Sequence, residues 1–91
     1  MAEGQRWQVI LARQPQKVLR RLPRRLLQRV ERTIEGLAEN PRPPGCKRLV
    51  GHRDLYRVRV EDWRIIYALE DDRLIVLIVK IAPRGRAYRN L

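Results

Sequence analysis

Three consecutive segments in the second half of the chain have the pattern of β-strands, and they constrain the fold more than any other feature of the sequence. The first alternates cleanly between two kinds of side chain, as a strand with one buried face does. The third is almost wholly apolar, which is typical of a central strand buried on both faces. Turns this short join antiparallel neighbours. We therefore expect a meander of the strands Asp54–Val60, Trp63–Leu69 and Leu74–Ile81, with turns at Glu61–Asp62 and Glu70–Arg73.

The first half predicts one strand and two helices. The apolar run Trp7–Ala12 indicates a short strand that ends at Gln14-Pro15, and Pro15–Leu22 has a weak helical pattern. Pro23 is suited to the first turn of a second helix. An αα-hairpin follows, and residues 41–45, rich in proline, form a loop after it. The apolar stripe of the second helix consists of Leu26, Leu27, Val30, Ile34, Leu37 and Ala38.

These elements predict an α+β fold with the order β-α-α-β-β-β. The helices should pack on one face of a twisted, mostly antiparallel sheet. Ninety-one residues, of which 44% are hydrophobic, suffice for one domain that covers residues 1–91. The polar start of the chain indicates no signal peptide, and the apolar run Leu74–Val79 is too short for a membrane span. Cys46 is the single cysteine, which fits a reducing compartment, and we expect a cytoplasmic protein.

The charge balance points to a polyanionic partner. Lys and Arg total 21 against 10 Asp and Glu, a formal net charge of +11. A domain this small and basic repels itself, and bound nucleic acid or an acidic protein would offset that cost. Nearly all the positive charge is arginine, which forms planar bidentate contacts with phosphate and stacks on bases. A GC-rich genome would also explain the preference for arginine, although it would not explain the net charge.

Several basic side chains should gather on one face of the sheet. Arg57 and Arg59 point the same way from one strand, and Arg64 lies near them on the adjacent strand. Arg84 and Tyr88 follow the last strand and can reach its end. Such a groove suits phosphate binding and base stacking. Alternatively, Arg57 and Arg59 form a solvated face, and Arg64 forms a structural ion pair with Glu61 or Asp62.

Other chemistries lack the residues they need. The chain contains no serine and only one histidine, His52, and it has neither a P-loop nor a dinucleotide-binding motif. We therefore expect no metal site and no cofactor. Catalysis would be electrostatic and would depend on arginine, helped by a tyrosine or His52. Tyr56 and Tyr67 share the apolar face of the predicted strands and are expected in the core.

The segment 56–67, Tyr-Arg-Val-Arg-Val-Glu-Asp-Trp-Arg-Ile-Ile-Tyr, closely resembles the central signature of the RelE/ParE toxin superfamily, roughly YRVRVGDYRIIY. Arg84, followed four residues later by Tyr88, is similar to the basic C-terminal motif of that family. The Leu22-Pro23 and Asn40-Pro41 pairs also match. The resemblance covers most of the chain and is specific over residues 48–89.

This resemblance implies the toxin of a type II toxin–antitoxin system that cleaves mRNA on the ribosome without a metal. The 2′-hydroxyl beside the scissile phosphate attacks it in line, basic side chains stabilise the pentacovalent phosphate, and a tyrosine orients the substrate. The chain departs from many relatives at Ala82-Pro83, where they have Gly followed by His or Lys. The implied catalytic residues are Arg57, Arg59, Arg64, Arg84 and Tyr88, and the expected RNA-binding residues are Arg53, Lys80, Arg86 and Arg89.

The resemblance also leaves two other functions open. A ParE-like toxin would poison DNA gyrase without cleaving anything, and a degenerate relative would only bind RNA or its antitoxin. Retention of Arg64, Arg84 and Tyr88 favours the nuclease. In each toxin reading the expected partner is a cognate antitoxin, whose acidic or amphipathic segment covers the basic groove or a sheet edge. The nuclease would in addition contact mRNA and ribosomal RNA, and no membrane.

Overall fold

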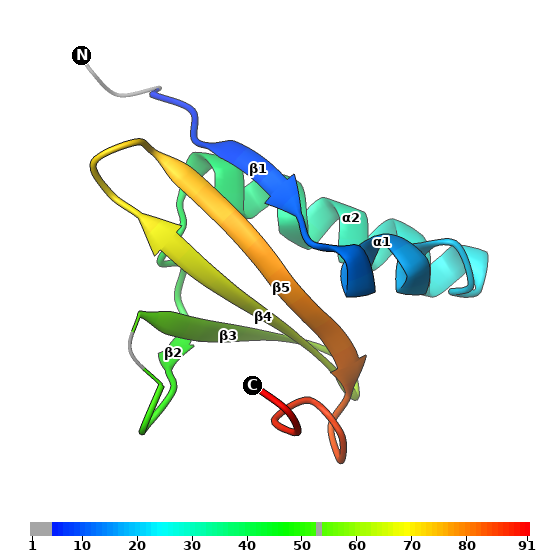
Figure 1. Ribbon diagram of the computed structural model, residues 1–91. Helices are drawn as coiled ribbons and strands as arrows, with labels where there is room; N and C mark the ends of the chain where they lie inside the picture. The colour runs from blue at the N-terminus through cyan, green and yellow to red at the C-terminus, as the bar shows by residue number, and fades with distance from the viewer. Residues whose placement is uncertain (1–4, 53) are drawn as a thin grey trace.

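A computed structural model describes residues 5–52 and 54–91 of the chain. It contains a five-stranded mixed sheet in the order β1-β5-β4-β3-β2, with two helices on one side of it (Figure 1). The α+β fold with helices on one face, predicted from the sequence, is confirmed. The elements are β1 Gln8–Leu11, α1 Arg13–Leu19, α2 Arg24–Glu39, β2 Lys47–Arg48, β3 Leu55–Val60, β4 Trp63–Glu70 and β5 Ile75–Pro83.

The predicted meander is present, and two strand pairings extend it. β3, β4 and β5 pair antiparallel in sequence order. β1 pairs parallel with β5 from Gln8 opposite Ile75 to Leu11 opposite Ile78, which makes β5 an inner strand, as its apolar sequence predicts. The short β2, which pairs with β3, was not predicted because two residues between a proline-rich loop and a glycine carry no periodic signal. β5 also continues through Pro83, beyond the predicted end at Ile81.

The first strand lies within the predicted Trp7–Ala12, but the predicted break at Gln14-Pro15 is wrong, because the helix begins before Pro15. The strand ends at Leu11, and both residues lie in the first turn of α1, which begins at Arg13. Proline is compatible with this position because the first N–H groups of a helix have no partner within it. The side chain of Gln14 turns back to β5, where Nε2 donates to the Ile81 carbonyl at 2.8 Å and Oε1 accepts from the Ile81 N–H at 2.9 Å.

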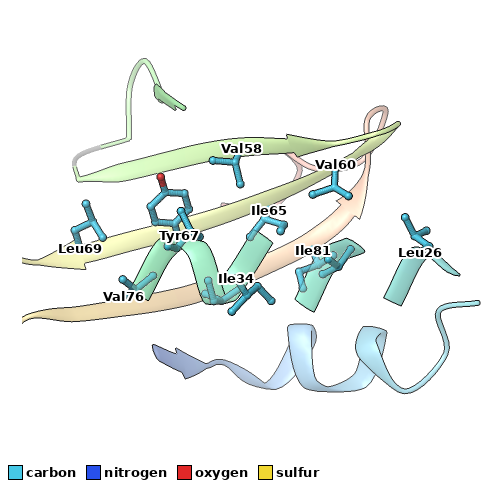
Figure 2. Packing of buried hydrophobic residues seen from close by; sticks show 12 residues of the cluster. Leu26, Ile34, Val58, Val60, Ile65, Tyr67, Leu69, Val76 and Ile81 are labelled. Atoms are coloured by element: carbon cyan, nitrogen blue, oxygen red, sulfur yellow. The ribbon is translucent and has the colours of Figure 1, made fainter. Parts of the chain in front are cut away.

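α2 supplies the helical side of the core. Pro23 is its N-cap, one residue before the helix begins, rather than a member of its first turn. The predicted apolar stripe faces the sheet, where it meets the inner side chains of β3, β4 and β5 (Figure 2). Burial of side chains of this size stabilises the fold by about 1.5–3 kcal/mol each. The buried residues of α2 are Leu26, Val30, Ile34, Leu37 and Ala38, whereas Leu27 is half-buried.

The loop after α2 is fastened to the sheet through two tyrosines. Tyr67 is fully buried, as predicted, and its hydroxyl donates to the Pro41 carbonyl at 2.8 Å. Burial raises the pKa of this phenol well above its usual value. Tyr56, half-buried, stacks on Tyr67 with ring centroids 5.7 Å apart, and the guanidinium of Arg42 lies 5.3 Å from the Tyr56 ring. Arg42 also binds Asp71 beyond β4, at 3.1 Å.

A β-bulge decides which side chains of β5 reach each face. Ile66 pairs with Lys80, but the next residue, Tyr67, pairs with Ile78, so Val79 is an extra residue in β5. The bulge shifts the period of two. Consequently Ile78 and Ile81, three residues apart, both enter the core, and Lys80 lies on the face away from the helices. No helix in the described part of the chain is long and apolar enough to cross a membrane.

Candidate functional site

The sheet face away from the helices, here called the outer face, brings three of the predicted arginines together. Arg59 and Arg64 are direct cross-strand partners on β3 and β4. Arg57 lies two residues from Arg59 and projects from the same face, opposite Ile66. Like charges directly opposite each other destabilise a sheet. This cluster therefore suits an anion bound between the guanidinium groups.

Arg57 and Arg64 are unusual because they are buried, each with a relative exposure of 7%. The guanidinium of Arg64 donates through Nη1 to the carbonyls of Trp63 at 3.0 Å and Glu61 at 3.3 Å. That of Arg57 donates to the Gly45 carbonyl at 3.4 Å. Arg59, by contrast, is exposed. The alternative of an Arg64 ion pair with Glu61 or Asp62 is wrong, since Arg64 binds backbone carbonyls and no ion pair in the described residues contains it.

The C-terminal segment, residues 84–91, turns back beside the sheet on the side away from the helices (Figure 1). The N–H of Arg84 donates to the Asp62 carbonyl at 2.7 Å, which places Arg84 at the β3–β4 turn. Lys80 Nζ donates to the carbonyl of Arg89. Ala87 is fully buried, and so is Ile66 on the outer face beneath the segment. The segment is thus part of the packed structure and not a free tail.

The side chains of this segment remain available to a ligand. Arg84, Arg86 and Arg89 are exposed, and the relative exposure of Tyr88 is 46%. In residues 5–52 and 54–91, no ion pair contains any of the five residues predicted to be catalytic. Elsewhere on the surface arginines do pair with carboxylates. Arg53, predicted to bind RNA, lies outside the described residues.

Glu61 organises the β3–β4 turn, a role that the sequence analysis missed. Its carboxylate accepts from Arg25 of α2 at 2.6 and 3.2 Å and lies 3.3 Å from Arg29. The hydrogen bond from Arg25 lowers the pKa of Glu61, and the positive charges of Arg25 and Arg29 add to the effect. Glu61 has φ 55°, in the left-handed region. One turn thus connects α2, Arg64 and the backbone of Arg84.

The functional roles of Glu61 and Gln14 could not be read from the sequence for different reasons. The contacts of Glu61 come from α2, whose position relative to the hairpin depends on packing between distant segments. Gln14 was interpreted as a strand terminator, and its hydrogen bonds reach Ile81 across most of the chain. The resemblance stated above offered one signal for Glu61, because the family signature has Gly at this turn position and the observed φ favours Gly.

Comparison with known proteins identifies the family. The family model described as ParE toxin of type II toxin-antitoxin system, parDE, matches residues 9–88. The chain belongs to the RelE/ParE family of type II toxins. A protein of Methanocaldococcus jannaschii named as the toxin RelE1 is 42% identical over 60 residues, which span 63% of this chain and 67% of that protein.

Solved structures of this family share the fold. The archaeal RelE–RelB complex from Pyrococcus horikoshii aligns with a TM-score of 0.78 at 32% identity, over 89% of this chain and 98% of that chain. The toxin–antitoxin complex RelBE2 from Mycobacterium tuberculosis aligns with a TM-score of 0.75 over 90% of this chain and 95% of that chain. Its identity of 22% supports the likeness of fold alone.

Proposed function

We propose that this toxin is a metal-independent endoribonuclease that cleaves mRNA on the ribosome. The observation that carries the proposal is the placement of Arg64. Its side chain is buried and held by two carbonyl oxygens of the β3–β4 turn, directly opposite Arg59. A cation fixed in advance stabilises developing negative charge without reorganisation during the reaction. Membership of a toxin family supports the proposal that the bound anion is a phosphate of the toxin's target.

In the proposed reaction the 2′-oxygen of the RNA attacks the adjacent phosphorus as the bond to the 5′-oxygen breaks, leaving a 2′,3′-cyclic phosphate. Arg57, Arg59, Arg64 and Arg84 stabilise the pentacovalent phosphate, and Tyr88 orients or stacks the substrate. Arginine keeps its proton near neutral pH, so it does not serve as the base. The proton of the 2′-hydroxyl passes to His52, water or a ribosomal group, directly or relayed through the Tyr88 hydroxyl, and water or a ribosomal group gives a proton to the leaving 5′-oxygen.

We propose that the basic residues around the outer face bind the RNA on both sides of the scissile phosphate. Lys80, Arg86 and Arg89 are the described members of this set, and Arg53 is added from the sequence. The proposed protein partner is a cognate antitoxin, because the structural relative from Pyrococcus horikoshii is a RelE–RelB complex. An acidic segment of the antitoxin would cover the same arginines.

A second candidate is inhibition of DNA gyrase without cleavage, which the ParE description of the matching family model favours. That function needs no preorganised phosphate site. The buried Arg64 and the retained Arg84 and Tyr88 therefore favour cleavage.

The test adds the protein to a cell-free translation extract and maps the mRNA ends. Wild type is compared with Arg64→Ala/Arg84→Ala, and with Arg20→Ala/Arg21→Ala as a control that removes the same charge from the exposed α1–α2 connection. We expect wild type and control to cleave at similar rates. The rate of the site variant should be lower by a factor of about 10²–10³ or more. Intact mRNA with all three proteins, at concentrations above that of the ribosome, rejects the nuclease and leads to a supercoiling assay.

A further inference from the structure

A surface pocket of about 610 Å³ lies where α1, the ends of β4 and β5 and the C-terminal segment meet. It opens beside the edge of β5, at the point where β1 has ended and Gln14 of α1 takes its place. This volume falls within the range of small-molecule and cofactor sites, about 300–1,000 Å³. No residue of the proposed catalytic set lines the pocket.

The pocket has an aromatic and apolar floor. Trp63, the first residue of β4, is half-buried: one part packs against the core, and another part lines the pocket. Val18 of α1 and Ile81 of β5 complete this floor. Gln14 closes the back, and because its amide is bound to both polar groups of Ile81, the edge of β5 offers no free ladder position there. A flat, partly apolar ring fits such a floor better than an added strand does.

The rim of the pocket is positively charged. Lys80, Arg86 and Arg89 line it together with Asn90, and Arg86 and Arg89 are exposed. None of these cations has a carboxylate partner in the part of the chain that the structure describes. An indole below and guanidinium groups at the rim are the pairing with which proteins hold a base and its phosphate.

The pocket adjoins the proposed catalytic arginines through direct strand neighbours. Trp63 precedes Arg64 on β4, so the two side chains leave opposite faces of the sheet. The pocket continues around the edge of β5 to the outer face, where Ala82, which lines it, is the cross-strand partner of Arg64. A single strand whose phosphate lies at Arg64 can pass over Ala82 to this edge and place its neighbouring nucleotide in the pocket.

We propose that this pocket binds one nucleotide next to the scissile phosphate, with its base stacked on Trp63 and its phosphate bound by Arg86 and Arg89. The inference rests on the proposed nuclease function for the identity of the strand, and it makes Trp63 the residue that holds the flanking base whatever its identity. Asn90 at the rim can hydrogen-bond to a base edge. The pocket thereby assigns any preference for the flanking base to Asn90 at the edge of β5 and not to the arginine cluster.

Fluorescence of Trp63 tests the pocket without requiring cleavage. Trp7→Phe leaves Trp63 as the one tryptophan. Titration with each of the four nucleoside 5′-monophosphates should quench its emission, because a stacked base quenches indole, whereas inorganic phosphate at equal ionic strength should not. In the Trp7→Phe background, Arg86→Ala/Arg89→Ala should weaken binding about tenfold or more. Arg20→Ala/Arg21→Ala, which removes the same charge elsewhere, should leave it unchanged.

Three outcomes overturn the proposal. They are no quenching by any nucleotide, equal quenching by inorganic phosphate, and nucleotide affinities that are equal in the Arg86→Ala/Arg89→Ala and Arg20→Ala/Arg21→Ala variants. Cleavage mapping separates this failure from failure of the nuclease. A protein that cleaves mRNA but shows none of the expected quenching keeps its function and loses this pocket. One that binds nucleotides as expected but never cleaves keeps the pocket. Because variants of Trp63 lack the fluorescent reporter, their binding is measured by calorimetric titration with the same nucleotides: Trp63→Tyr should retain binding, and Trp63→Leu, if folded by circular dichroism, should lose it.

Discussion

Gln14 replaces a strand residue at the edge of β5 by holding both the N–H and the carbonyl of Ile81 with one side-chain amide. The N–H of Ala12 makes the last backbone hydrogen bond to β5, at the Ile78 carbonyl, and from Arg13 the chain forms α1. The amide group supplies the same donor and acceptor that a strand would supply. The same contact fixes the first turn of α1 against the sheet.

We expect Gln14→Ala to lower the free energy of unfolding by about 1–3 kcal/mol, because it leaves two backbone groups of a buried residue without partners. Gln16→Ala is the matched control, since Gln16 lies on the same helix and donates to the Leu11 carbonyl from an exposed position. Its effect should stay within about 0.5 kcal/mol. Urea denaturation measures both free energies of unfolding. Equal effects would show that the two hydrogen bonds of Gln14 to Ile81 stabilise the fold no more than the exposed bond of Gln16 does.

Arg59 should lower the stability of the sheet and strengthen the binding of RNA. Arg59→Gln removes the positive charge opposite Arg64 and should stabilise the sheet by about 0.2–1 kcal/mol at low salt. It should also weaken binding of single-stranded RNA and make log K against log salt shallower by about 0.7. The control is Arg73→Gln, which removes an exposed charge paired with Glu70. A destabilised Arg59 variant would show that the two arginines do not repel each other.

The loss of stability at acid pH should depend on Glu61. Its pKa is lower in the folded protein than its usual 4.5, so its contribution is present above that value and is lost as the pH falls through the folded pKa. The melting temperature of Glu61→Gln should therefore lie below wild type near neutral pH and approach it in acid. Asp72→Asn, a change at an exposed turn carboxylate, should show no such convergence.

Glu61→Gly adds a second comparison at the same turn. Glycine accepts the left-handed backbone at φ 55°, so this variant should recover part of the stability that Glu61→Gln loses. It should still cleave RNA more slowly than wild type, because the carboxylate that connects α2 to the turn is absent. Wild-type cleavage by Glu61→Gly would show that this connection does not position Arg64.

The loss of stability at alkaline pH should depend on Tyr67. Burial raises its pKa above the usual 10.0, so the phenol stays neutral in the fold but ionises in the unfolded chain, and stability falls as the pH rises above 10.0. Tyr67→Phe should lose about 0.5–1.5 kcal/mol near neutral pH, through the bond to Pro41, and be less sensitive to alkali. Unfolding midpoints over pH check this, with the exposed Tyr88→Phe as control.

Strand alternation predicted the half of the fold that is built from neighbours in sequence. The hairpin of β3 and β4 needs only a period of two and a short turn, and this hairpin is what sets Arg59 opposite Arg64. The parallel pairing of β1 with β5 has no such local signal, because the paired residues are far apart along the chain. The β5 bulge has no local signal either. It places Ile78 and Ile81 in the core while Lys80 lies on the outer face.

The candidate site divides in the same way. The sequence indicated which arginines share a face, but it did not indicate that Arg57 and Arg64 are buried. Their guanidinium groups bind backbone carbonyls of the proline-rich loop and of the β3–β4 turn, and these contacts depend on how the loops fold. Strand alternation places Trp63 on the same face as Ile65 and Tyr67, but its place in a pocket depends on α1 and the C-terminal segment, which lie far from it in the sequence.

The parallel pairing of β1 with β5 also bears on how the protein is made. Two strands from opposite ends of the described chain must meet before the sheet is complete, which is a contact of long sequence separation and slow to form. A nascent chain on the ribosome holds β1 unpaired until its partners in β5, Ile75 to Ile78, have emerged. The arginines of the hairpin therefore leave the ribosome before the sheet is complete, which gives a partner an interval in which to bind the toxin.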